Sequence, residues 1–75
     1  MKITAQSYRV LCKVFEHEEW VHALTKGDHL VYTKKGYLRP VVIPKYKEVP
    51  EFIIKDNLRT AGISNEKYFE ILNKK

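Results

Sequence analysis

The stretch that decides the fold is residues 20–44, WVHALTKGDHLVYTKKGYLRPVVIP. Apolar and β-branched residues form three runs within it, and the breaks at 25–27 and 34–36 each contain a glycine. Runs of this length between turn residues are typical of strands joined by tight turns. The predicted strands are residues 20–24, 28–33 and 37–43. Pro40 has no backbone N–H to donate, so the third strand is expected at an edge of an antiparallel sheet.

Helical spacing appears on both sides of this predicted sheet. Before it, apolar residues recur at helical intervals up to about His17, and Thr4 is a candidate cap. After it, Pro50 suits the start of a second helix, Gly62 its end, and Ser64 the cap of a short third helix. The residues expected on the buried helix faces are Tyr8, Leu11, Val14, Phe15, Phe52, Ile53, Leu58, Ala61, Tyr68, Phe69, Ile71 and Leu72. The order of helix, three strands, helix and helix predicts an α+β fold with its helices on one face of the sheet.

A chain of 75 residues has room for one small core, so a single domain over residues 1–75 is expected. The sequence has neither the run of about 18 apolar residues that crosses a membrane nor the apolar stretch of a secretory signal. We therefore expect a cytoplasmic protein without a membrane partner. Cys12 is the only cysteine, which excludes an internal disulfide and a cysteine-based zinc site.

The net charge of +5 lies entirely in the middle of the chain. Acidic and basic residues balance before residue 21 and after residue 47, whereas residues 21–47 contain Asp28 as their only acid. The basic residues of this middle segment are Lys26, Lys34, Lys35, Arg39, Lys45 and Lys47. Phosphates are the natural ligand for such a segment, and RNA is the predicted partner. The alternative is that the lysines only keep the hairpin soluble and protect a sheet edge.

Tyrosines are interleaved with these basic residues. Tyr37 and Tyr46 are candidates for stacking against RNA bases, because surfaces that follow a phosphate backbone commonly add aromatic rings. Ordinary surface tyrosines are the alternative interpretation of the same two residues.

One of the three histidines has a setting suited to catalysis. His29 follows the Gly27 turn at the start of a predicted strand, close to Lys26. An imidazole can take a proton from a ribose 2′-hydroxyl or give one to a departing oxygen, while Lys26 and the Gly27 turn hold the phosphate. This chemistry cleaves RNA without a metal. The alternative for His29 is a structural strand residue whose ring is half-buried.

Two resemblances sharpen these predictions. The element order resembles the double-stranded RNA-binding domain. Several motifs resemble the HicA (YcfA-like) family of toxins from bacterial and archaeal toxin–antitoxin pairs. The matching segments, spread over residues 18–64, are Trp20, Gly-Asp-His at 27–29 with the alternating strand after it, Gly36, Val-Ile-Pro at 42–44, and Leu-Arg-Thr-Ala-Gly-Ile-Ser at 58–64.

The HicA resemblance implies a metal-independent endoribonuclease that cleaves messenger RNA, an mRNA interferase with His29 as the catalytic residue. It also implies a HicB-like antitoxin as partner and no cofactor. Two positions depart from the family pattern: Asp28 replaces a serine, and Tyr46 replaces a second histidine. Asp28 either stabilises the protonated ring of His29 or repels RNA.

Two other functions fit the same residues. One is a non-catalytic RNA-binding module of the same fold, in which His29 is structural. The other is a protein-interaction domain whose basic hairpin binds an acidic partner.

Overall fold

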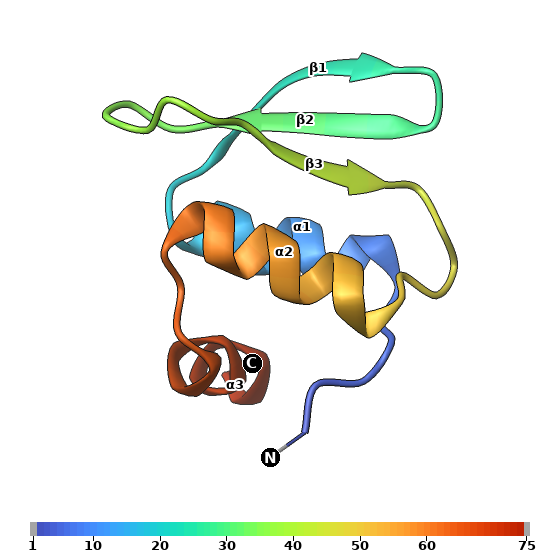
Figure 1. Cartoon of the computed structure of the whole chain (residues 1–75), viewed down its shortest axis with the longest axis vertical. Coiled ribbons are helices and arrows are strands. Elements are labelled where there is room, and N and C mark those ends of the chain that lie inside the picture. Colours follow the sequence, from blue (N-terminus) through green and yellow to red (C-terminus); the bar gives the residue numbers. More distant parts are fainter. Residues whose placement is uncertain (1, 75) are drawn as a thin grey trace.

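The computed structural model describes residues 2–74. Three antiparallel strands form one sheet in the order β1-β2-β3, and the helices lie on one side of it (Figure 1). The elements are α1 (Tyr8–His17), β1 (Val21–Lys26), β2 (His29–Thr33), β3 (Val41–Pro44), α2 (Glu51–Ala61) and α3 (Asn65–Asn73). The predicted α+β class, the element order and the double-stranded RNA-binding-domain-like arrangement are confirmed.

The core lies between the sheet and the helices. From the sheet, Tyr32, Val41 and Ile43 are buried against the helix side. The helices contribute Leu11, Val14, Phe15, Ile54, Leu58, Ala61, Tyr68 and Ile71. The prediction that Phe52 is buried is wrong, because its side chain is 64% exposed. The buried face of α2 is formed by residues 54, 57, 58 and 61, and Phe52 lies about 200° around the helix from Ile54.

Serine hydroxyls cap the starts of α1 and α3, and a glycine ends α2. The first helix begins at Tyr8 with Ser7 as its cap, so the prediction of a cap at Thr4 is wrong. The chain before Ser7 is extended instead, because Gln6 and Val49 exchange two backbone hydrogen bonds of 3.3 and 2.7 Å. The predicted end at Gly62 is confirmed by its left-handed backbone (φ 69°). The predicted cap at Ser64 is confirmed by the bond that its hydroxyl accepts from the Lys67 N–H at 3.1 Å.

The strands differ from the prediction at their ends. Strand β1 continues to Lys26, and Trp20 lies before it, buried in the core. Strand β3 begins only at Val41, so the prediction that 37–40 are strand residues is wrong. Pro40 cannot donate to the ladder, which explains why pairing starts after it. The third strand does lie at an edge, as predicted.

A two-residue turn joins β1 to β2 and fixes which residues of the two strands lie opposite each other. Gly27 adopts a φ of 58°, a conformation that glycine reaches without strain. As a result, Lys26 of β1 pairs with His29 of β2, and His29 pairs with Pro44 of β3.

Candidate nucleic-acid interface

The two faces of the sheet differ in character. Leu30 and Tyr32 of β2 pack against the core on the helix side. Because side chains alternate along a strand, His29 and Val31 point to the opposite face, which no helix covers in Figure 1. We call this the open face. His29 is exposed at one end of it.

Basic residues surround His29 at this end of the sheet. Lys26 is its direct neighbour on β1, so the two side chains share the open face. The segment after β3 returns to the same turn, where the Lys45 N–H donates to the Asp28 carbonyl at 2.7 Å. Lys45, Tyr46 and Lys47 are all exposed. Residues 26–29 and 45–47 therefore form one exposed basic group around the imidazole, which we call the His29 end.

Residues 45–47 are held on both sides by backbone hydrogen bonds. The Asp28 carbonyl fixes Lys45, and the Tyr46 carbonyl accepts from the Tyr8 N–H at 3.1 Å. Val49 then pairs with Gln6. These bonds place Lys45 next to the β1–β2 turn through the backbone alone, and Lys47 follows two residues later in the chain.

The three histidines have different surroundings. The His17 ring lies 3.1 Å from the Glu18 carboxylate. The His22 ring lies 2.9 Å from the Thr25 hydroxyl and against the Tyr32 ring, with ring centroids 5.6 Å apart. Within residues 2–74, His29 is the histidine whose ring has no side-chain partner. Its imidazole faces solvent at the basic end of the open face.

The other predicted RNA-binding residues lie at the far end of β2, in the 34–40 loop. The length of β2 from His29 to Thr33 separates the two groups by about 13 Å. The Lys34 side chain has partners within the protein: its Nζ donates to the Glu18 carbonyl at 2.8 Å and lies 5.5 Å from the centre of the Tyr37 ring. Tyr37 in turn packs on Trp20, with ring centroids 5.0 Å apart. Lys35 and Arg39 are exposed.

Arg39 shares a hollow with residues of α2 that were not among the predicted site residues. The hollow has a volume of about 450 Å³ and is lined by Arg39, Asp56, Arg59 and Thr60. Charges balance along the last third of the chain, so nothing in the linear sequence singled out Arg59. The fold brings it to the 34–40 loop.

A partly buried cluster beneath the sheet, formed by Cys12, Glu16 and Tyr32, borders the core. The Tyr32 hydroxyl donates to the Glu16 carboxylate at 2.7 Å and links β2 to α1. Burial raises the pKa of Tyr32 and is also the main cause that raises the pKa of the Cys12 thiol, which lies beside it. Neither group is poised to act as a nucleophile near neutral pH.

Among residues 2–74, no three histidine, cysteine, aspartate or glutamate side chains are grouped as metal ligands. No helix in this part of the chain is long and apolar enough to cross a membrane.

A family model described as HicA toxin of bacterial toxin–antitoxin matches residues 8–63. The chain belongs to the HicA toxin family. No curated protein and no solved structure is significantly similar to it. The matched part of this HicA-family chain contains the whole sheet, His29 and residues 45–47. A toxin of such a system is one half of a pair, so family membership implies an antitoxin as partner.

Proposed function

We propose that this HicA-family toxin is a metal-independent endoribonuclease that cleaves messenger RNA, with His29 as its acid–base residue. One observation carries the proposal: the imidazole is exposed on the open face, free of side-chain partners within residues 2–74, and surrounded by lysines of the His29 end. Family membership supports the toxin role. The exposed position supports contact with a large substrate that cannot enter a deep pocket.

The reaction uses the ribose 2′-hydroxyl as its nucleophile. His29 takes the hydroxyl proton as the 2′ oxygen attacks the adjacent phosphorus. The bond from phosphorus to the 5′ oxygen breaks, and that oxygen leaves with a proton from water or from a lysine ammonium. The products are a 2′,3′-cyclic phosphate and a 5′-hydroxyl. Lys26 and Lys45 stabilise the charge that develops on the phosphate oxygens.

Asp28 does not reverse the local charge. It is the single acid among residues 26–29 and 45–47, against three lysines. Its backbone carbonyl accepts the hydrogen bond that holds Lys45 beside the turn. The replacement of the family serine by Asp28 is therefore compatible with an anionic substrate at the His29 end.

The proposed partner is a HicB-like antitoxin with an acidic surface that covers the open face. Leu24 and Val42 lie opposite Val31 on the two neighbouring strands and are 51% and 38% exposed. Apolar side chains on an uncovered sheet face, bordered by lysines, suit a partner that is apolar at its centre and acidic at its rim. An antitoxin bound there would also keep RNA away from His29.

Growth arrest on induction tests the proposed toxin activity. We expect wild type to arrest growth, His29→Ala to be inactive, and His22→Ala to remain toxic. His22→Ala is a matched control because it removes an exposed histidine from the same hairpin. Thermal midpoints of all three proteins show whether each variant folds. If His29→Ala folds and arrests growth as wild type does, the catalytic role is wrong. If wild type binds RNA without arrest or cleavage, a non-catalytic RNA-binding module replaces the proposal.

A further inference from the structure

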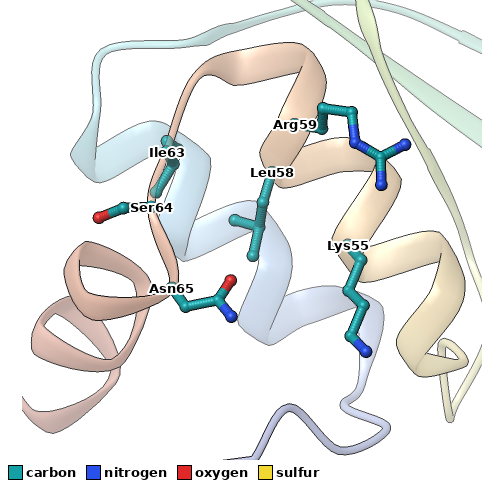
Figure 2. Close-up of a pocket in the computed structure, with 6 residues that line it drawn as sticks. All are labelled: Lys55, Leu58, Arg59, Ile63, Ser64 and Asn65. Atoms are coloured by element: carbon teal, nitrogen blue, oxygen red, sulfur yellow. The ribbon is translucent and has the colours of Figure 1, made fainter.

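A second basic site lies at the other end of the sheet, on the helix side. The hollow between the 34–40 loop and α2 is lined by Arg39, Asp56, Arg59 and Thr60. A neighbouring hollow of about 400 Å³ along α2 is lined by Arg59 and Lys55 together with the 63–65 link (Figure 2). Arg59 thus borders both hollows. In Figure 2 its side chain projects from α2 on the side away from Ser64 and Asn65.

The positive charge of this site comes from separate elements. A single basic residue in the last turn of α2 is explained by the helix dipole, which favours a cation there. The dipole does not explain Arg39, which reaches the same hollow from the 34–40 loop. Lys55, one turn before Arg59 on α2, borders only the neighbouring hollow, and its Nζ lies 3.5 Å from the Glu51 carboxylate. Asp56 is the one acid in the lining of either hollow.

The existing partner of Arg59 is easily displaced. Asp56 lies 3.1 Å from the Arg59 guanidinium, but the two side chains are 65% and 79% exposed. Exposed ion pairs are weak because water screens them. A phosphate can therefore replace or share Asp56 as the ligand of Arg59, and Arg39 remains available to the same anion. Two guanidinium groups and the Thr60 hydroxyl supply the planar, multiple hydrogen bonds that phosphate oxygens accept.

The lining favours a nucleic acid over a protein segment. Every residue around the Arg39–Arg59 hollow is polar or charged. A protein partner gains most of its affinity from apolar or aromatic anchors buried in pockets, and this hollow has no apolar floor for one. A phosphate needs only charge and hydrogen bonds.

We infer that Arg39, Arg59 and Thr60 form a second binding site for an RNA phosphate, remote from His29; this inference rests on the proposed ribonuclease function. The two sites are separated by at least the length of β2, about 13 Å. At a rise of about 3.4 Å per stacked nucleotide, an RNA must span roughly four nucleotides or more to touch both. The protein therefore prefers longer RNA chains and holds them around the loop end of the sheet.

The test compares two variants that each lose two positive charges. Both are made in the His29→Ala background, so that the RNA stays intact. One carries Arg39→Gln and Arg59→Gln. The matched control carries Lys13→Gln and Lys74→Gln, which border a different groove between α1 and α3. Affinity is measured by fluorescence anisotropy with a trinucleotide and with an RNA of about 20 nucleotides, each at several salt concentrations.

The arginine variant is expected to bind the long RNA about tenfold more weakly than the control does, with a salt slope lower by between about 0.7 and 0.9, because one phosphate contact is lost. Its affinity for the trinucleotide should equal that of the control. If both variants bind the long RNA equally while the His29→Ala parent binds it well, the second site is wrong and the proposed function stands. If the parent binds no RNA and wild type cuts none, both fail. If the arginine variant loses affinity for polyglutamate but not for RNA, the hollow is a protein site and the inference is overturned.

Discussion

Lysine and tyrosine residues lie near both ends of strand β2, but their side chains make different contacts at the two ends. At the His29 end, Lys26, Lys45 and Tyr46 are exposed, and only the backbone fixes their position. At the loop end, Lys34 donates to the Glu18 carbonyl and Tyr37 packs on Trp20. Tyr37 and Tyr46 are nevertheless equally exposed, at 45% each. Exposure alone does not separate a residue that is free to bind a ligand from one that holds the fold together.

Long-range packing makes the difference. Glu19 adopts a left-handed backbone (φ 70°) after α1, and the Trp20 N–H bonds back to the Phe15 carbonyl at 2.9 Å. This turn buries Trp20 beneath the 34–40 loop, where it serves as the platform for Tyr37. Among residues 2–74, no aromatic ring packs against Tyr46 as Trp20 packs against Tyr37. We therefore expect mutations at the two ends to separate RNA binding from stability.

The largest effect on RNA binding is expected from replacing the lysines of the His29 end. Replacing both Lys26 and Lys45 with glutamine in the His29→Ala background should weaken RNA binding by about tenfold or more, because two phosphate contacts are lost. The thermal midpoint should stay close to that of the parent, since neither ammonium group makes a hydrogen bond or an ion pair within residues 2–74.

Lys34→Gln is the contrasting variant. It should keep RNA affinity within about twofold and lower the free energy of unfolding by about 1 kcal/mol, through loss of the bond to the Glu18 carbonyl. RNA titration and urea unfolding of both proteins measure the two quantities. Equal losses of RNA affinity in both variants would contradict the distinction between the two ends.

The two tyrosines should behave in opposite ways. Tyr37→Ala removes the contact with Trp20 and should lower the free energy of unfolding by between about 1 and 2 kcal/mol. Tyr46→Ala should cost less than about 0.5 kcal/mol and instead weaken RNA binding, if its ring stacks on a base. Urea unfolding and RNA titration of the two variants check this. A larger loss of stability for Tyr46→Ala than for Tyr37→Ala would contradict the structural role of the Tyr37–Trp20 contact.

The smallest effect concerns alkaline pH. Burial raises the pKa of Cys12, Tyr32 and Tyr68 in the folded protein, so the unfolded chain releases these protons first. Stability from these groups is complete below the unfolded pKa and is lost as pH rises above it. The thiol is the first to titrate, and we expect a loss below about 1 kcal/mol between pH of about 8 and 9. Urea midpoints at each pH measure it. Cys12→Ala should flatten the curve, and an unchanged slope in that variant would assign the loss elsewhere.

Much of the fold follows from local chemistry. The caps at Ser64 and Gly62, the glycine turn at Gly27 and the edge position of the third strand were predictable from the properties of single residues. The errors arose where partners are distant in sequence. The helix cap is Ser7 and not Thr4, because Gln6 pairs with Val49, which comes after the whole sheet in the sequence.

Less of the candidate site was predictable from the sequence, because the fold determines which of its residues lie close together. Lys26 and His29 are close in sequence and stay together across the turn. Lys34 and Tyr37 looked equivalent to Lys45 and Tyr46, since nothing in the linear pattern shows the contacts to Glu18 and Trp20. Arg59 was not predicted as a site residue for a different reason. Its charge is balanced by acids nearby in sequence, while the fold places it beside Arg39.

The most direct measurement is cleavage of a labelled RNA by purified protein in the presence of EDTA, with wild type, His29→Ala and His22→Ala compared. We predict cleavage by wild type and His22→Ala and none by His29→Ala. The product should carry a 2′,3′-cyclic phosphate, and a 2′-deoxy substitution at the cleaved nucleotide should abolish the reaction. Equal cleavage by His29→Ala, or cleavage of the 2′-deoxy substrate, would contradict the role of His29 in activating the ribose hydroxyl.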